Sequence, residues 1–311
     1  MSRVVVTDYT FPSLTQEQAA AGQDFAAHQC RTAEDVATAV AGAQVAVVQF
    51  APFGPAAAAA MQPGGTVIRY GVGYNNIDLA ACAAHGLRVG YVPDYCADEV
   101  AEHTAAMALA MLRKLPMMDA SVRRGEWAAV RVAKPMKPFG QTQFGFFGLG
   151  QIGRAVLTRL RGFGFQFMAH DPGVTALEGV EMVSAEELLA RADIISLHAP
   201  ATSVTTEYFN AARLATMQPH AIIVNSARGQ LIVEADLADA LTRGVIAGAA
   251  LDVFHVEPLP ADNPLRQAPN LLLMPHAAWY SEVAIHRLQE LVAEDIARAL
   301  RGIGPRKPVP L

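Results

Sequence analysis

The feature that most constrains the fold of this 311-residue chain is a run of three glycines that follows a short apolar segment. Residues 144–147 read Phe-Gly-Phe-Phe, and Gly148, Gly150 and Gly153 follow in the spacing G-x-G-x-x-G before a segment with helical character. Gly148 permits a tight turn, Gly150 lets a pyrophosphate approach the backbone, and Gly153 lets the helix pack close to the strand. The pattern predicts the first strand, turn and helix of a dinucleotide-binding α/β domain.

An acidic residue stands where such a domain holds the adenosine ribose. The next predicted strand, residues 166–170, ends at Asp171, 18 residues after Gly153. Its carboxylate is placed to accept hydrogen bonds from the ribose hydroxyls, and its charge would repel a 2′-phosphate, so NAD is expected rather than NADP. His198 ends another predicted strand and would line the cofactor crevice; the alternative is a strand-end residue that faces solvent.

Short β-branched runs alternate with Ala-rich helical segments along most of the chain. This alternation predicts crossover units and mostly parallel sheets. Strands are expected at residues 4–7, 45–49, 67–70, 143–147, 166–170, 194–198, 221–225, 246–251 and 271–274. The segments 135–140 and 258–269 are rich in Pro or Gly and are expected to be loops.

The chain is too long for one comfortable hydrophobic core, so two domains are expected. A longer helix over 98–123 separates an N-terminal α/β block from the glycine-rich block, and another over 281–301 follows the last predicted strand. The predicted fold has two Rossmann-like or flavodoxin-like α/β domains with parallel sheets. Residues 1–99 plus 284–311 form a discontinuous substrate-binding domain, and residues 100–283 form the NAD-binding domain.

Composition excludes several classes of protein. Apolar residues make up 52% of the chain and charged residues 17%, which excludes a disordered chain. The net charge of −5 and the lack of a basic tract argue against nucleic-acid and membrane partners. Three cysteines without close spacing predict neither a disulfide framework nor a metal site. With no signal-peptide pattern at the start, a cytoplasmic protein is expected.

Three later segments, residues 224–229, 249–258 and 273–280, end predicted strands with polar residues. Because the carboxyl ends of parallel strands line the ligand crevice, Arg228, Asp252, Glu257 and His276 are expected to converge on the nicotinamide end of the cofactor. Reduction of a 2-oxo acid needs a hydride donor, a proton donor for the carbonyl oxygen and a cation for the carboxylate.

His276 can be the acid/base, because imidazole titrates near neutral pH. Glu257 can orient it and favour its protonated form. Arg228 can hold the carboxylate and carbonyl in a planar fork, and Asp252 can accept from the nicotinamide amide. Taken singly, each of these side chains also fits a purely structural or surface role.

Together these segments resemble the D-isomer-specific 2-hydroxyacid dehydrogenase family. That family shows G-L-G-x-I-G, N-x-A-R-G, A-L-D-V-x-x-x-E-P and P-H in this order, and the sequence carries all four motifs. Residues 70–78 also resemble a substrate-domain stretch of the family, with Asn75 where the family usually has Asp. The resemblance covers nearly the whole chain.

The resemblance implies roles for individual residues. Arg228, Glu257 and His276 match the catalytic triad, and the N–H groups of Val72 and Gly73 match the clamp for the substrate carboxylate. The residues that match cofactor contacts are Gly150, Gln151, Ile152, Asp171, Ala227 and Asp252, and His276 is expected beside them. The family fold places NAD in the cleft between the domains and forms homodimers through the cofactor domain.

A closer likeness concerns residues 275–282, which resemble the C-terminal-binding proteins, NAD-binding corepressors of this family. Arg69 matches a substrate-contacting Arg of that subgroup, and Trp279 would place its indole against the substrate side chain. Packing between domains for Trp279 and a salt bridge for Arg69 are the alternatives.

The predicted function is therefore an NAD-dependent oxidoreductase for a small 2-oxo or 2-hydroxy acid, such as glyoxylate, hydroxypyruvate or a phosphoglycerate-type substrate. An NAD-sensing corepressor-like binding protein is the alternative, and phosphite or formate dehydrogenases are lesser ones. Glu257 disfavours formate, for which the family pattern has Gln.

Overall fold

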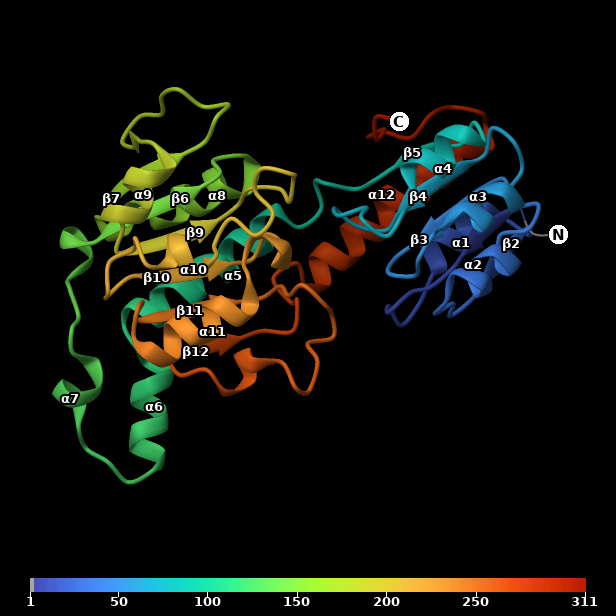
Figure 1. Cartoon of the computed structure of the whole chain (residues 1–311). Coiled ribbons are helices and arrows are strands. Elements are labelled where there is room, and N and C mark those ends of the chain that lie inside the picture. The colour runs from blue at the N-terminus through green and yellow to red at the C-terminus, as the bar shows by residue number, and fades with distance from the viewer. Residues whose placement is uncertain (1–2) are drawn as a thin grey trace. The chain divides into compact units, whose positions relative to one another are not determined.

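The chain divides into two compact units, each with its own parallel sheet (Figure 1). The computed structural model describes residues 3–311. Unit 1 comprises the chain up to Cys96 together with Tyr280–Leu311, and unit 2 comprises Ala97–Trp279. The limits expected from the sequence were residues 99 and 283. The predicted class, two α/β domains of which the first is discontinuous, is confirmed.

Unit 1 is built on a five-stranded parallel sheet in the order β2-β1-β3-β4-β5, the order of flavodoxin-like domains. Its strands are β1 (Val4–Val6), β2 (Phe25–Ala27), β3 (Val45–Val48), β4 (Thr66–Arg69) and β5 (Arg88–Gly90). Every residue of β1 and β3 is buried, which explains why these strands read as unbroken apolar runs.

Helices cover this sheet. They are α1 (Thr15–Ala21), α2 (Ala33–Ala39), α3 (Pro55–Ala60), α4 (Leu79–Ala84) and α12 (Glu282–Leu300). Local chemistry sets where several begin: Thr32 and Asp35 form a capping box on α2, Asp78 caps α4, and Ser281 caps α12. Helix α12 packs against α1, so the last helix of the chain completes a domain begun by its first strand.

Unit 2 carries a seven-stranded parallel sheet in the order β12-β11-β10-β9-β6-β7-β8. Its strands are β6 (Gln143–Phe147), β7 (Gln166–His170), β8 (Glu181–Met182), β9 (Ile194–Leu197), β10 (Ile222–Asn225), β11 (Gly248–Leu251) and β12 (Leu271–Leu273). The order reverses between β6 and β9, as in Rossmann domains, and ligands bind at such a switch point. The residues of β9 alternate between the cores on the two faces of the sheet.

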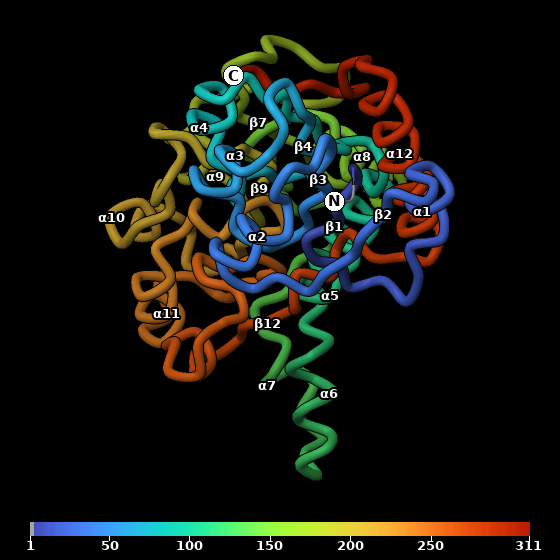
Figure 2. Tube along the Cα trace, turned by 90° about the vertical axis from the view of Figure 1, so that its right-hand side faces the viewer, coloured from blue at the N-terminus to red at the C-terminus, as the bar shows by residue number. Residues whose placement is uncertain are grey.

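The helices of unit 2 lie on both faces of its sheet or extend from it. They are α5 (Ala97–Leu112), α6 (Leu115–Arg123), α7 (Ala129–Ala133), α8 (Gln151–Leu160), α9 (Ala185–Arg191), α10 (Ala211–Leu214) and α11 (Glu234–Arg243), with 3-10 turns at η1 (Phe139–Gln141), η2 (Arg161–Phe163), η3 (Gly229–Leu231) and η4 (Pro264–Gln267). Helices α6 and α7 pair with each other and extend from the rest of unit 2 as an arm, residues 115–133 (Figures 1 and 2).

The prediction of one helix over residues 98–123 is wrong. The chain leaves helical geometry after α5, because Lys114 adopts the left-handed conformation with φ of 52°. Helix α6 then restarts with Pro116 in its first turn, where a missing N–H costs no hydrogen bond. The expected strand list also omitted β2, β5 and β8, which have only three, three and two residues. In the part of the chain that the structure describes, no helix has the length and apolarity needed to span a bilayer.

Candidate active site

The glycine turn follows β6 at the switch point of the unit 2 sheet. Gly148 has φ of +95°, and a Cβ there would lie 2.7 Å from the backbone nitrogen of Ala199. A Cβ at Gly153 would lie 2.8 Å from the carbonyl oxygen of Gly148, so helix and strand approach as closely as glycine allows. A Cβ at Gly150 would meet nothing within 4 Å. The space in front of Gly150 is therefore open to a ligand.

The N-terminus of α8 begins at this turn. Gly150 is its N-cap residue, and Gln151 and Ile152 form its first turn. The first N–H groups of a helix have no acceptor within it and sit at the positive end of the helix dipole. An open turn followed by a ten-residue helix fits the pyrophosphate of a dinucleotide.

Asp171 lies at the end of β7, next to the same turn. One carboxylate oxygen accepts from the backbone N–H of Leu149 at 2.6 Å, and the other accepts from Gly173 at 2.8 Å. Asp171 thus ties the glycine turn to the β7 loop while a carboxylate oxygen keeps lone pairs for a further donor. This position fits the expected contact with a ribose hydroxyl.

His198 follows β9 and lies behind the glycine turn. Its Nε2 is 2.9 Å from the hydroxyl of Ser196, its ring stacks on Phe146 with centroids 5.9 Å apart, and its Cδ2 would be 3.5 Å from a Cβ at Gly153. Burial lowers the pKa of His198 to about 3, so the ring stays neutral at physiological pH. These contacts give His198 a role in supporting the turn, and its place near the cofactor stays a prediction.

Arg228 is held by a short turn after β10. The Asn225 side chain accepts from the N–H of Ala227 at 3.0 Å and donates to the carbonyl oxygen of Arg228 at 2.8 Å. Gly229 follows, and a Cβ there would lie 2.0 Å from the carbonyl carbon of Phe254. Only glycine permits this approach, and the approach brings Arg228 beside the loop that carries Glu257.

Glu257 and His276 form the central pair of the candidate site. His276 Nδ1 lies 2.6 Å from Glu257 Oε2, and Glu257 Oε1 accepts from the Phe254 N–H at 2.9 Å. Burial raises the pKa of the Glu257 carboxyl, but the hydrogen bond and charge of His276, the Phe254 N–H and the charge of Arg228 outweigh it, so the net pKa is lowered. Glu257 is thus an ionised partner for the imidazole at neutral pH.

The other ring nitrogen of His276 is available for chemistry. Its Nε2 has no hydrogen-bond partner among residues 3–311, and 42% of the side chain is exposed. His276 also has φ of 53°, a conformation that a non-glycine residue adopts only when its surroundings impose it. A ring held at Nδ1 and open at Nε2 suits proton exchange with a ligand.

Asp252 holds the loop in which His276 adopts this backbone conformation. Its side chain is fully buried, and its two oxygens accept from the consecutive N–H groups of Ala277 at 2.8 Å and Ala278 at 2.9 Å. His103 of α5 lies 3.8 Å from one of these oxygens. Asp252 was expected at the nicotinamide; its contacts here show a clamp on the loop that carries His276.

In unit 1, residues 70–78 form the loop after β4. Neither Val72 nor Gly73 donates its backbone N–H to an acceptor in residues 3–311, although both residues are partly buried. Gly71 has φ of +145°, a backbone conformation that residues with a side chain rarely adopt, and it lies against the Arg69 guanidinium. Arg69 also donates to the Tyr70 carbonyl oxygen and lies over the Phe50 ring. Two unused N–H groups on one loop fit a carboxylate.

Further side-chain contacts, between residues far apart in the sequence, hold these loops. Glu234 at the start of α11 accepts from the His255 N–H at 2.7 Å and from Asn263 Nδ2 at 2.6 Å, which fixes the loop that carries Glu257. The Thr104 hydroxyl of α5 meets Ser226 beside the Arg228 turn at 2.5 Å. Partners separated by 21 and 122 residues leave no local signal in the sequence.

The strand order, the switch point and the open glycine turn define unit 2 as a dinucleotide-binding domain of the Rossmann type. Residues 105–278 match the model of the family described as D-isomer specific 2-hydroxyacid dehydrogenase, NAD binding domain. This match covers more than half of the chain, and the chain belongs to that family. The family predicted from the sequence motifs is confirmed.

Known proteins similar to the chain differ in their named activities. It is 42% identical over 239 residues to D-3-phosphoglycerate dehydrogenase of Methanocaldococcus jannaschii, an alignment that covers 75% of this chain and 45% of that protein. It is 37% identical over 245 residues to glyoxylate reductase of Korarchaeum cryptofilum, covering 76% and 73%.

Among solved structures, the NADPH-dependent glyoxylate/hydroxypyruvate reductase of Sinorhizobium meliloti in complex with citrate superposes with a TM-score of 0.84 at 28% identity. That alignment covers 99% of this chain and 98% of the other. The chain spans less than half the length of the phosphoglycerate dehydrogenases that it matches.

Proposed function

We propose that the protein is an NAD-dependent D-2-hydroxyacid dehydrogenase that interconverts a small 2-oxo acid and its 2-hydroxy acid. The observation that carries the proposal is the Glu257–His276 pair, with Nδ1 bound to a carboxylate and Nε2 available, beside Arg228. Bound NAD(H) would supply or accept the hydride. The open turn at Gly150, the first turn of α8 and Asp171 fit this cofactor.

In this proposal, His276 donates a proton from Nε2 to the substrate oxygen during reduction and takes it back during oxidation. Glu257 accepts from Nδ1, so it fixes the ring orientation and balances the positive charge of the protonated ring. The Arg228 guanidinium attracts the carboxylate and polarises the carbonyl oxygen. The N–H groups of Val72 and Gly73 bind the substrate carboxylate, as unpaired donors favour an anion.

The experiment is NADH oxidation with a panel of glyoxylate, hydroxypyruvate, 3-phosphohydroxypyruvate and bulkier 2-oxo acids. We expect turnover of at least one acid and a loss of 10²–10⁴-fold in His276→Ala, with NADH affinity near that of the parent protein. His286→Ala is the matched control, because His286 is an exposed histidine on α12 with only an i,i+4 partner. Loss of turnover and NADH affinity together in His276→Ala would contradict the assigned role.

The likeness of residues 275–282 to C-terminal-binding proteins remains a prediction, as do substrate contacts of Arg69 and Trp279. A corepressor-like protein would bind peptides in an NAD-dependent way and show no turnover on the panel. The phosphite and formate alternatives are tested by adding these anions to the enzyme with NAD.

We also propose a homodimer formed through unit 2. The arm of residues 115–133 and the loop between its helices expose apolar side chains, with Trp127 94%, Val130 79% and Val122 54% accessible. Exposed apolar side chains grouped in this way are typical of a surface that a partner covers. Sedimentation should give a dimer for the parent protein and a monomer for Trp127→Asp/Val130→Asp; a monomeric parent protein would contradict the proposal.

A further inference from the structure

Unit 2 contains a cavity at the end of its sheet opposite to the candidate active site. The cavity has a volume of about 120 Å³ and lies at the root of the arm, with Met117 of α6 and Met136 beyond α7 in its wall. Ile222 and Gly248, the first residues of β10 and β11, line it. All of its lining residues belong to unit 2.

The cavity is separate from the glycine turn and the catalytic residues. The Arg228 turn follows the carboxyl end of β10 at Asn225, whereas the cavity touches the amino end of the same strand at Ile222. At about 3.3 Å per residue, these ends are about 10 Å apart along the strand. A ligand here therefore neither reaches the hydride-transfer position nor shares residues with it.

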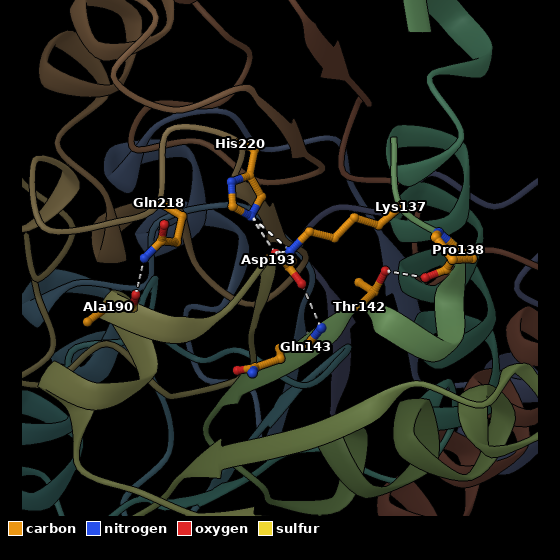
Figure 3. Close-up of polar contacts among 8 residues, drawn as sticks. All are labelled: Lys137, Pro138, Thr142, Gln143, Ala190, Asp193, Gln218 and His220. Carbon is orange, nitrogen blue, oxygen red and sulfur yellow. Dashed lines mark hydrogen bonds and ion pairs between the residues drawn. The ribbon is translucent and has the colours of Figure 1, made fainter. Parts of the chain in front are cut away.

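A hydrogen-bonded cluster forms the polar wall of the cavity (Figure 3). The Asp193 side chain, 6% exposed, accepts from the Gln143 N–H and from Lys137 Nζ, each at 2.8 Å, and from His220 Nε2. Figure 3 shows the Lys137 and His220 side chains converging on this carboxylate. With three donors bound, Asp193 is already satisfied and leaves little acceptor capacity for a ligand.

The hydrogen-bonding groups of this wall that remain unused are the cationic donors of two lysines. Lys137 keeps ammonium protons beyond its bond to Asp193, and Lys114 uses one of three in a bond of 3.2 Å to the Lys134 carbonyl oxygen. Two lysines and one aspartate give a net charge of +1 when His220 is neutral. Burial lowers the pKa of Lys114, and an anion bound beside it would stabilise its charged form. The wall therefore favours an anion.

Apart from Thr142, whose hydroxyl donates to the Pro138 carbonyl oxygen, the rest of the lining is apolar. Its aliphatic side chains include Met111, Leu112, Met117, Met136 and Ile222. A cavity of roughly 150 Å³ holds a molecule the size of benzene, so about 120 Å³ limits the enclosed apolar tail of a ligand to about five heavy atoms. One charged end and a short apolar tail are the features that match both walls.

We infer that this cavity is a binding site for a short-chain aliphatic carboxylate, with the carboxylate on Lys137 and Lys114 and the alkyl tail among the methionines. The site is distinct from the one that binds the 2-oxo acid. Because the cavity lies at the root of the arm, its ligand would stabilise the junction between α5 and α6. This position makes the cavity a candidate site for a regulatory metabolite.

The test is isothermal titration calorimetry of the protein with sodium valerate. Valeramide and pentylamine serve as the neutral and cationic analogues. We expect a Kd for valerate on the order of 1 mM and at least about tenfold weaker binding of both analogues. Ala247→Leu, which fills the cavity, and Lys137→Gln should each weaken valerate binding about tenfold or more. Lys307→Gln, at an exposed lysine of unit 1, should not change it.

Arg228→Gln separates this site from the candidate active site, which also attracts carboxylates. Valerate binding unchanged in Arg228→Gln and lost in Ala247→Leu supports the inference. Valerate binding lost in Arg228→Gln, retained in Ala247→Leu, or absent at 20-fold the expected Kd overturns it. Equal affinity for valeramide overturns the anionic class of ligand. Circular dichroism of each variant verifies that it is folded, and none of these outcomes depends on the turnover assay.

Discussion

The contact between Gly229 and the Phe254–His255 peptide offers a direct test of how the candidate site is assembled. In Gly229→Ala, the new Cβ would lie 2.0 Å from the carbonyl carbon of Phe254 and 2.4 Å from the nitrogen of His255. Since carbon atoms pack at about 3.5 Å, the two loops must separate by about 1.5 Å. This separation moves Arg228 away from Glu257 and from the substrate position that both would serve.

A displacement of about 1 Å in an active site can cost on the order of 100-fold in rate, so kcat/KM for reduction should fall by that factor or more. Overpacking should also lower the free energy of unfolding by about 1–3 kcal/mol. NADH affinity should change little, because the glycine turn lies after a different strand. Steady-state NADH oxidation, NADH fluorescence titration and urea denaturation measure the three quantities.

The matched control is Gly162→Ala, because a Cβ at Gly162 would meet nothing within 4 Å and its backbone needs no positive φ. This variant should keep parent-like activity and stability. If Gly229→Ala were as active as Gly162→Ala, the position of Arg228 would not depend on the close approach of the two loops. Equal losses of NADH affinity and turnover in Gly229→Ala would show instead that the damage spreads through the whole of unit 2.

Three other predictions follow from side chains described above. Asp171→Ala should raise the ratio of kcat/KM for NADPH to that for NADH at least about tenfold, since it removes the charge that repels a 2′-phosphate; an unchanged ratio would exclude Asp171 from the ribose site. Asp252→Asn should lower kcat by about tenfold or more with normal NADH affinity, because one amide oxygen cannot replace both acceptors of the Ala277 and Ala278 N–H groups; parent-like kcat would show that the clamp is unnecessary. His198, with its pKa near 3 when folded and about 6.5 when unfolded, takes up a proton on unfolding at acid pH, so the free energy of unfolding should fall by about 2 kcal/mol from pH 7 to pH 5, and His198→Gln should lack this part of the decrease in urea titrations.

Much of the fold could be predicted because its signals are local. The strands around the glycine turn, residues 143–147 and 166–170, agree with β6 and β7 at both ends. Their apolar and aromatic character and their spacing from Gly148 and Asp171 are visible within about 30 residues of sequence. The omitted strands β2, β5 and β8 contain at most one β-branched residue each, so they lack such a pattern, and they exist because they pair with a neighbouring strand.

For the candidate site, the sequence predicts which strands end next to the functional residues. Glu257 and His276 follow β11 and β12, so parallel topology alone predicts that they meet. What remained unpredictable depends on contacts between distant segments, such as the fit of Gly229 against Phe254. The two hydrogen bonds that Asp252 accepts from consecutive backbone N–H groups belong to the same class, since they depend on the exact position of the loop after β12.

Unit 1 is assembled from the two ends of the sequence, and this has a consequence for biosynthesis. Its sheet begins with β1 near residue 4, yet α12, which packs on α1, ends at residue 300. Unit 2 is continuous and can fold as soon as residue 279 has left the ribosome. The face of α1 that buries Glu17 stays uncovered until α12 has been made, so unit 1 is incomplete while the whole of unit 2 is synthesised. Chaperone dependence of this protein should therefore arise from its first 96 residues rather than from its nucleotide-binding domain.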